Sequence, residues 1–385
     1  DINWFTPVQH PANDMTTNII TTHFDYHSID KNLLKLDILG HDDPTMIRML
    51  QDLTGEDPMK VPLDDKGVLS LFTGTEALGI RPEDIGGCKL GVLGIPEFGT
   101  DFVMGMLLDT RPSSFSELIR ISGLSHGTNV WLDNAQEYIR NKDATLSTAI
   151  CTRDDIMLNL IGWGVEPEHS FKIMEAVRKG RGLMPEQEAE MREHNVPDWY
   201  IASCKKIKYM FPKAHAAAYV MNAFRIAYYK INYPLAYYAA FFSIRATTFN
   251  YATMAQGREM LDYQMRELER NPERSNKDDE TIKDMKIVRE MYARGFSFHK
   301  LDLYRAKASK FTIIDGKLMP AINTIEGLVG TAADAVDEAA KNGPFLSKDD
   351  LRLRAKVSKG AIDTLSQLGI LGDIPETNQI SLFDA

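Results

Sequence analysis

Residues 204–219 read CKKIKYMFPKAHAAAY and lie where two predicted helices meet. Apolar residues recur at helical spacing on both sides of Pro212, which predicts helices over 197–209 and 215–231. Pro and Gly separate further helical segments upstream, so we expect one helical domain. These upstream helices are predicted over 102–108, 114–122, 130–141, 154–162, 167–178 and 185–194.

The sequence after Cys204 is basic and rich in aromatic residues. Between Lys205 and Arg245 it has no Asp or Glu, although the whole chain carries a formal net charge of −10. Because charges more than about 8 Å apart are screened at physiological salt, a basic surface can exist on an acidic protein. Such a surface would bind phosphates and stack bases; the alternative is a helix pair whose lysines extend along apolar surface. The seven cations are Lys205, Lys206, Lys208, Lys213, Arg225, Lys230 and Arg245.

Composition predicts a soluble, cytoplasmic protein with about two to four domains. Apolar residues make up 44% of the 385 residues and charged residues 25%, as in ordinary globular proteins. The longest apolar stretches are interrupted by charges, so we expect no membrane span. The cysteines Cys88, Cys151 and Cys204 form no CxxC pair, which argues against a zinc site or a disulfide framework. The chain begins at Asp1 without a methionine, and we interpret it as a fragment.

An acidic residue interrupts the most apolar segment of the N-terminal region. Residues 33–39 read LLKLDIL and predict a strand, and helical spacing predicts a helix over 45–53. Asp37 lies inside that strand, where an unpaired buried carboxylate would be costly. It is therefore either a functional residue or a strand-edge residue that faces solvent. Residues 56–100 are rich in Gly, Pro and Asp and predict irregular connections.

The predicted structure changes after residue 250. Residues 250–293 predict a charged, solvent-exposed helix pair, and 311–314 predicts a strand before a turn at Asp315-Gly316. Two units follow in which a glycine turn precedes a short helix, predicted over 332–341 and 361–368. This is the plan of a helix-hairpin-helix, whose backbone N–H groups face a phosphate. An ordinary helical hairpin also uses glycine and remains the alternative.

The C-terminal tail Gln379-Ile380-Ser381-Leu382-Phe383-Asp384-Ala385 resembles the peptide by which bacterial replication proteins bind the sliding clamp. Leu382 and Phe383 are adjacent large apolar side chains, and Gln379 offers an amide as a polar anchor. This combination suits a pocket on a partner. The alternative is a terminus whose apolar residues fold back onto the protein.

Three longer blocks, together with this tail, resemble the PolC family. These polymerases are the family C DNA polymerase III alpha subunits of low-GC Gram-positive bacteria. The blocks are LKLDILGHDDPT at 34–45, ISGLSHGT at 121–128 and CKKIKYMFPKAHAAAY at 204–219. The resemblance extends from about Phe5 to the end of the chain and implies the C-terminal part of such a polymerase.

The resemblance implies one ligand of a catalytic metal site. In family C polymerases three palm aspartates hold two Mg²⁺ ions, and Asp37 is in the position of the third. Phosphoryl transfer to a 3′-hydroxyl uses such ions, and hard cations prefer carboxylate oxygens. Nothing before Asp37 supplies the Asp-x-Asp pair of the family, and its PHP and exonuclease domains are absent. We therefore expect this chain to be unable to polymerise DNA by itself.

The resemblance also implies that the helical domain forms the fingers, which hold the incoming nucleotide. Cations near helix starts suit its triphosphate, and the Gly-punctuated turn at 122–127 is placed near the nascent base pair. A helix-start histidine without a ligand is the alternative for His215. No nucleophile-elbow pattern surrounds the serines, so a hydrolase triad is not expected. The nucleotide-binding candidates are Arg153, Lys208, Lys213, His215, Ser122, Ser125 and His126.

The tandem hairpins are expected to hold duplex DNA behind the active site. In the first hairpin Val329 stands where the usual turn has its second glycine, and Gly330 follows it. Because Val resists φ > 0, we expect a reshaped turn with a weaker phosphate contact. The DNA-binding candidates are Gly327, Gly330, Lys359 and Gly360, and the clamp-binding candidates are Gln379, Ile380, Ser381, Leu382 and Phe383.

The predicted fold is mainly α with a small β component. Its predicted domains are the end of the palm (1–48), the fingers (49–249), a charged helical connection (250–299), a tandem helix-hairpin-helix domain (300–376) and a clamp-binding tail (377–385).

The predicted function is the C-terminal part of a replicative DNA polymerase. It would work in the cytoplasm with Mg²⁺, deoxynucleoside triphosphates, primer-template DNA, the sliding clamp and other replisome subunits, away from membranes. One alternative is a non-catalytic adaptor that binds DNA and clamp, for which Asp37 would have no use. Another is a helical enzyme of unrelated chemistry, which would not bind DNA.

Overall fold

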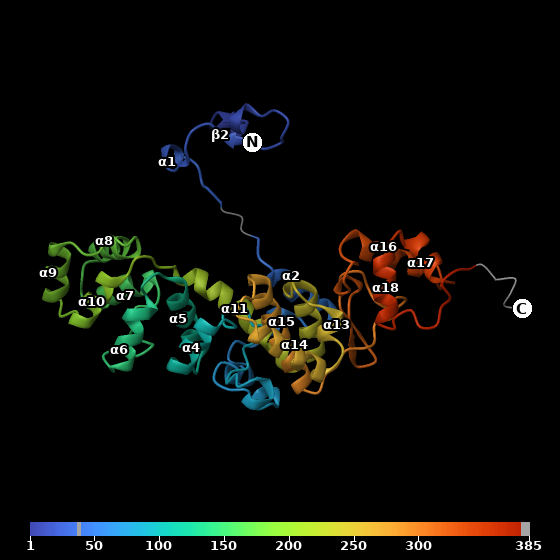
Figure 1. Cartoon of the computed structure of the whole chain (residues 1–385). Coiled ribbons are helices and arrows are strands. Elements are labelled where there is room, and N and C mark those ends of the chain that lie inside the picture. Colours follow the sequence, from blue (N-terminus) through green and yellow to red (C-terminus); the bar gives the residue numbers. More distant parts are fainter. Residues whose placement is uncertain (37–39, 379–385) are drawn as a thin grey trace, which may run out of the picture. The chain divides into compact units, whose positions relative to one another are not determined.

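The computed structural model describes residues 1–36 and 40–378, which form two compact units, Asp1–His41 (unit 1) and Asp42–Ala385 (unit 2). The fold of these residues is mainly helical with two small antiparallel sheets, as predicted (Figure 1). None of the helices within the described ranges combines the length and the hydrophobicity that crossing a bilayer requires.

Unit 1 consists of short elements that enclose almost no core, and Thr6 is its one buried residue among those described. Its first strand pairs with its second at Val8↔Thr22 and Gln9↔Thr21. The elements are η1 (Ile2–Trp4), β1 (Val8–Gln9), η2 (Pro11–Asn13), β2 (Thr21–Thr22) and α1 (Tyr26–Ile29).

The strand expected over 33–39 is wrong for the part that the structure describes. Residues 33–36 form no strand, and Leu34 and Leu36 are 84% and 75% exposed. A strand needs a neighbour for its backbone groups, and these residues pair with no other described strand. Asp37 itself lies outside the described residues.

Unit 2 is organised around the 20-residue helix α11 (Lys213–Asn232), which begins after Pro212 as the sequence indicates. Helices α2 (Asp43–Thr54), α3 (Lys66–Ser70), α5 (Phe115–His126) and α12 (Pro234–Ala240) pack against it. In α2, Met46 and Leu50 are one turn apart and buried, and Gly55 ends the helix in a left-handed conformation. The predicted palm boundary at residue 48 falls inside this helix.

The remaining elements of the helical region follow the predicted order, with short turns before residue 100 and longer helices after it. They are η3 (Pro58–Lys60), η4 (Glu76–Leu78), η5 (Pro82–Ile85), α4 (Asp101–Thr110), η6 (Trp131–Ala135), α6 (Gln136–Arg140), α7 (Arg153–Gly162), α8 (Pro167–Arg178), α9 (Pro185–Glu193), α10 (Asp198–Lys206) and η7 (Phe241–Arg245).

The helix predicted over 130–141 is interrupted, because Leu132, Asp133 and Asn134 have non-helical backbone angles. The cause is tertiary. The buried Asn134 amide donates to the carbonyl of Asn129 at 2.8 Å and accepts from the Ser203 hydroxyl at 2.6 Å. These bonds satisfy a buried polar side chain that a continuous helix would orient differently.

The charged pair predicted over 250–293 is not a solvated excursion. It comprises α13 (Tyr251–Met254), α14 (Arg258–Arg270) and α15 (Asn276–Ala293). One face of α15 is buried in the main core through Met285, Val288 and Met291. The apolar stripe of a helix determines whether it packs, and charges on its other face do not prevent this.

The C-terminal region of unit 2 has a second hydrophobic core. The predicted hairpin is confirmed, with β3 (Thr312–Ile314) paired to β4 (Lys317–Met319) across a turn in which Asp315 and Gly316 both have positive φ. The remaining elements are η8 (Ile322–Thr324), α16 (Thr331–Lys341), α17 (Lys348–Ala355) and α18 (Lys359–Gln367).

Candidate functional site

Three helix ends meet at the candidate site: the C-terminal end of α5 and the N-terminal ends of α7 and α11. Gly123 permits this, because a Cβ atom there would lie 2.6 Å from the carbonyl oxygen of Cys151. The backbone N–H of Arg153 donates to the carbonyl of Phe211 at 3.2 Å, which ties α7 to the residues before α11. The predicted residues on these helix ends therefore come together; they are Ser122, Ser125, His126, Arg153, Lys213 and His215.

His126 is held by contacts on both ring nitrogens. Its Nε2 lies 2.9 Å from Oε2 of Glu97, and its Nδ1 lies 3.0 Å from Oγ of Ser125 and 3.1 Å from the carbonyl oxygen of Ser122. Burial, with a smaller contribution from His215, lowers the pKa of His126. A neutral ring can donate from Nε2 to Glu97; the Ser125 hydroxyl, which otherwise donates to the Ser122 carbonyl at 2.9 Å, then has to turn its one proton to Nδ1.

Ser122 and Ser125 occupy different depths of the site. Ser122 is 2% exposed and lies beneath the surface, whereas Ser125 and His126 are partly exposed. A ligand at this surface would therefore contact Ser125 and His126 before Ser122.

His215 lies in a row of rings at the start of α11. Its ring centroid is 4.9 Å from that of Phe211, 4.4 Å from that of Tyr219 and 5.9 Å from that of His126. Burial lowers the pKa of His215 as well. Two neutral imidazoles and two aromatic rings thus form a mixed polar and aromatic surface.

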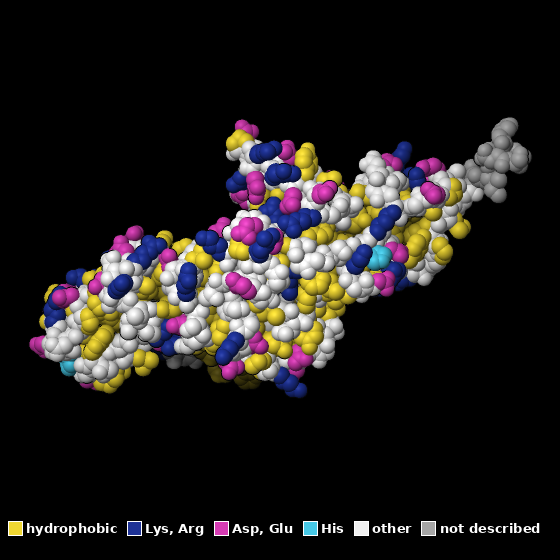
Figure 2. All heavy atoms as spheres, turned by 90° about the horizontal axis from the view of Figure 1, so that it is seen from below, with side chains coloured by type: hydrophobic (Ala, Val, Ile, Leu, Met, Phe, Trp, Pro, Cys, Tyr) yellow, Lys and Arg dark blue, Asp and Glu magenta, His cyan; other side chains and the backbone are white. Residues whose placement is uncertain are grey.

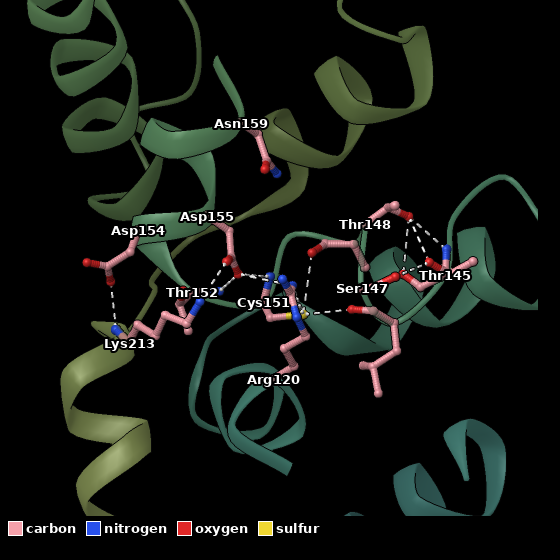
Figure 3. A network of polar contacts seen from close by, with 12 residues as sticks. Arg120, Thr145, Ser147, Thr148, Cys151, Thr152, Asp154, Asp155, Asn159 and Lys213 are labelled. Atoms are coloured by element: carbon pink, nitrogen blue, oxygen red, sulfur yellow. Dashed lines mark hydrogen bonds and ion pairs between the residues drawn. The ribbon is translucent and has the colours of Figure 1, made fainter. Parts of the chain in front are cut away.

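The carboxylate of Asp155 contacts residues of all three helices (Figure 3). Its Oδ2 accepts from the backbone N–H groups of Cys151 and Thr152 at 3.1 and 2.9 Å. The same atom lies 3.8 Å from Nη1 of Arg120 on α5, and Oδ1 lies 3.9 Å from Nζ of Lys213 on α11. Asp155 therefore fixes the start of α7 and holds a cation from each neighbouring helix near it.

The first residue of α11 is also held by a carboxylate. The backbone N–H of Lys213 donates to Oδ2 of Asp154 at 2.6 Å. Acidic side chains therefore already satisfy N–H groups at the starts of both α7 and α11. The side chains of Arg153 and Lys213, rather than the free helix ends, are what this surface offers to an anion.

Lys208 lies at the edge of this arrangement. The helix predicted over 197–209 ends at Lys206, because Lys208 and Tyr209 turn to pair with Thr128. The Lys208 side chain is exposed, and no contact within the described residues joins it to the other candidates. Its backbone N–H donates to the carbonyl of Thr128 at 3.0 Å, which places Lys208 beside the residues that follow α5.

The acid-free stretch does not form an acid-free surface. Acidic residues from other segments pair with five of its seven cations, and on the face drawn in Figure 2 basic and acidic side chains are interspersed. The pairs are Lys205–Glu188, Lys206–Glu137, Lys213–Asp155, Lys230–Glu290 and Arg245–Asp43.

Lys230 shows most clearly why a single basic face is the wrong expectation. Its side chain is 0% exposed, and its Nζ contacts the carbonyls of Gly91 and Leu93 at 2.8 and 2.7 Å and Oε1 of Glu290 at 2.9 Å. Burial lowers the pKa of Lys230. A side chain in this position cannot contact a phosphate at the surface.

The two predicted DNA-binding turns lie close together. A Cβ atom on Gly327 would lie 3.7 Å from Cβ of Ala361, in the first turn of α18. Gly327 and Gly330 adopt positive φ, and Val329 does not, so the first turn avoids strain at valine. Lys359 and Gly360 are the first residues of α18, which Ser358 caps by accepting from the N–H of Ala361 at 3.1 Å.

Two sets of predicted residues lie outside the described part of the chain: Asp37 and the tail residues Gln379, Ile380, Ser381, Leu382 and Phe383. Among the residues that the structure does describe, no three His, Cys, Asp or Glu side chains come close enough to hold a metal ion.

Three residues of the site were not predicted from the sequence: Glu97, Arg120 and Asp155. Thr152 and Asp155 have the spacing of a helix capping box, a signal that could have identified Asp155 as the start of α7. Glu97 is 29 residues from its partner His126, and Arg120 is 35 residues from its partner Asp155. No local sequence pattern indicates contacts over such separations.

Comparison with known proteins gives the family. The profile of the "Bacterial DNA polymerase III alpha subunit finger domain" matches residues 43–197, and that of the "Helix-hairpin-helix motif" matches residues 295–380. The chain is 54% identical over 380 residues to the PolC-type DNA polymerase III of Caldanaerobacter subterraneus subsp. tengcongensis. It belongs to the PolC-type DNA polymerase III family.

Other PolC-type relatives agree over nearly the whole chain. Identity is 55% to the proteins of Clostridium perfringens and Bacillus subtilis, with 98% and 100% of this chain aligned. The alignments cover 26% and 27% of those two relatives, and 27% of the first. The chain thus spans about a quarter of the length of the curated PolC-type proteins that it matches.

Proposed function

We propose that this chain provides nucleotide-, duplex- and clamp-binding parts of a replicative DNA polymerase. The observation that carries the proposal is the identity of 52–55% to PolC-type polymerases over nearly the whole chain. The convergence of six predicted residues at the ends of α5, α7 and α11 supports it independently, because they come from distant sequence segments. The fingers would extend over 49–249 and the duplex-binding domain over 300–376.

At the candidate site, the side chains of Arg153 and Lys213 would contact the triphosphate of the incoming nucleotide. Lys213 is part-exposed, and its contact to Asp155 at 3.9 Å is long, so its ammonium can exchange this partner for phosphate oxygens. The rings of His126 and His215 would lie near the nascent base pair. Both are neutral near pH 7 and can therefore donate or accept a hydrogen bond without a charge.

The hairpin turns would bind the phosphates of duplex DNA. Gly327 and Gly330 expose backbone at the first turn, and Lys359 lies at the start of α18 in the second. Since the two turns are adjacent, they would contact neighbouring parts of one duplex. The tail from Gln379 to Phe383 would bind the sliding clamp, and Asp37 would serve as one Mg²⁺ ligand; both rest on the family resemblance.

The nucleotide site is tested by titrating a fluorescent deoxynucleoside triphosphate into the chain, with and without Mg²⁺. Lys213→Ala should weaken binding about tenfold or more, since a charged hydrogen bond contributes about 1.5–3 kcal/mol. Lys205→Ala is the matched control, because Lys205 is an exposed lysine that pairs with Glu188 outside the cluster. Equal affinities for both variants would remove Lys213 from the site.

The clamp-binding tail is tested by surface plasmon resonance with an immobilised bacterial sliding clamp. Leu382→Ala with Phe383→Ala should reduce the affinity by about 2 kcal/mol, roughly 30-fold, if both are buried anchors. Asp384→Asn, just beyond the predicted motif, is the control. Clamp binding that survives the double substitution would contradict the assignment.

A further inference from the structure

A groove of about 690 Å³ lies in unit 2 between α2 and residues 307–323. One wall is the exposed side of α2 with Arg48 and Met49; the other carries Lys307 and Lys310. The predicted nucleotide-binding residues and the hairpin turns do not line it. It is therefore a feature separate from both sites proposed above.

The charge of this groove is positive. Arg48, Lys307 and Lys310 line it, and Asp52 is the one acidic residue among its lining residues. Arg48 pairs with Asp52 at 3.0 Å, whereas Lys307 and Lys310 are exposed and form no ion pair with any residue that the structure describes. Since Arg48 offsets Asp52, Lys307 and Lys310 leave this groove with a net positive charge on a chain whose net charge is −10, which favours an anion there.

The wall that carries the lysines is fixed by backbone hydrogen bonds. The N–H of Ile322 donates to the carbonyl of Lys307, and that of Asn323 to the carbonyl of Ala308, both at 2.9 Å. The N–H of Phe311 donates to Oγ of Ser243 at 2.8 Å, which ties this wall to η7. A preformed wall lowers the entropy cost of binding a ligand.

We propose that this groove binds the phosphodiester backbone of duplex DNA, as a contact additional to the hairpin turns. Lysine ammonium groups together with the hydroxyls of Ser309 and Thr312 and the amide of Asn323 offer the donors that phosphate oxygens accept. No base-reading arrangement is implied, so the contact is independent of DNA sequence. The assignment rests on the proposed function, which supplies the duplex, and residues 307–323 lie inside the segment matched by the helix-hairpin-helix profile.

The test measures the affinity of the 385-residue chain for a fluorescent 20-base-pair DNA duplex across a series of KCl concentrations. Each phosphate contact contributes about 0.9 to the slope of log K against log salt. Lys307→Ala with Lys310→Ala should therefore lower the slope by about 1.8. Lys317→Ala is the matched control, since Lys317 is an exposed lysine at the start of the nearby strand β4 but does not line the groove.

The outcomes separate this inference from the proposed function. If the unmodified chain does not bind the duplex at low salt, duplex binding itself is wrong. If it binds and the double variant keeps its slope and its thermal melting temperature, duplex binding stands and the groove assignment falls. A reduced slope with an unchanged melting temperature supports the groove, because the two lysines are exposed and their loss should not unfold the protein.

Discussion

At the scale of single residues, Lys230 and Glu290 form an ion pair that is fully buried. Both side chains are 0% exposed, and Tyr238 donates a further hydrogen bond to Glu290 at 2.7 Å. Desolvating two charges costs several kcal/mol, and only this full set of partners offsets that cost. The pair joins α11 to α15.

Lys230→Met should destabilise the protein by about 3–5 kcal/mol, because it leaves the Glu290 carboxylate buried and unpaired. The double variant Lys230→Met with Glu290→Gln should lose clearly less, since no unpaired charge remains. Equilibrium urea unfolding measures both. Lys205→Met removes the lysine of an exposed pair and should cost less than about 1 kcal/mol; a similar loss for Lys205 and Lys230 would contradict the argument.

His126 and His215 predict how stability depends on pH. Burial lowers the pKa of both below the ordinary value of 6.5, so the folded state binds protons less readily than the unfolded state. Their contribution is fully present above about pH 6.5 and is lost as the pH falls. The double variant His126→Asn with His215→Asn should therefore show a flatter fall in melting temperature between about pH 7.5 and 5.5.

His169 is the control with the opposite sign. Its hydrogen bond to Glu190 at 2.9 Å raises the pKa of His169, so its stabilisation is present below pH 6.5 and is lost as the pH rises. His169→Asn should make the fall in melting temperature on acidification steeper. If both sets of variants changed the pH dependence of the melting temperature in the same way, the assigned directions of the pKa shifts would be wrong.

At the scale of the element, the starts of α16 and α18 differ although the sequence presents both as glycine turns. Gly330 precedes α16 with φ 56° and ψ −127°, angles that residues with a side chain rarely adopt. Gly360 is inside the first turn of α18, without positive φ, and only the Ser358 hydroxyl lies near its missing Cβ, at 3.9 Å. The same residue type therefore has a conformational role in one turn and none in the other.

Gly330→Ala should destabilise the C-terminal region by about 1–3 kcal/mol, the usual cost of a strained backbone conformation. Gly360→Ala should be neutral or stabilising by up to about 1 kcal/mol, because alanine favours a helix over glycine. Thermal unfolding followed by circular dichroism distinguishes the two. Equal destabilisation would mean that the hairpins are equivalent, against the observed backbone angles.

The start of α7 depends on Asp155, which also positions Arg120 and Lys213. Asp155→Ala should cost about 1–2 kcal/mol from the lost helix cap and leave two backbone N–H groups of a buried segment without their acceptor. It should also weaken nucleotide binding, although Asp155 is not expected to touch the nucleotide. Asp154→Ala leaves these two hydrogen bonds in place and removes the acceptor of the Lys213 N–H instead, so it reports on the start of α11 and not on that of α7.

At the scale of the whole molecule, the two compact units differ in what stabilises them. Unit 2 has two hydrophobic cores, whereas unit 1 leaves large apolar side chains such as Trp4 and Phe5 exposed. Stability scales with buried apolar area, so unit 1 contributes little to cooperative unfolding. Deleting residues 1–41 should leave the urea midpoint unchanged, and a clearly lower midpoint would contradict this.

Helix periodicity and turn chemistry were sufficient to predict most elements of unit 2. Pro212 and the alanine-rich run after it determine where α11 starts, and Asp315-Gly316 determines the β3–β4 turn, because these signals act over a few residues. Predictions failed where distant groups decide the local conformation. Asn134 interrupts a helix to reach Ser203, and α15 is buried despite its charges because its apolar face is part of the main core and packs against α14 and η5.

The sequence by itself determined the family, the helical character and the identity of six of the residues that gather at the candidate site. Only the tertiary structure decided which charges are available there. The stretch after Cys204 lacks acids in sequence but not in space, since Glu188, Glu137, Asp155, Glu290 and Asp43 approach it from other segments. The physical reason is that electrostatic interaction depends on distance and burial, and neither is a property of neighbouring positions along the chain.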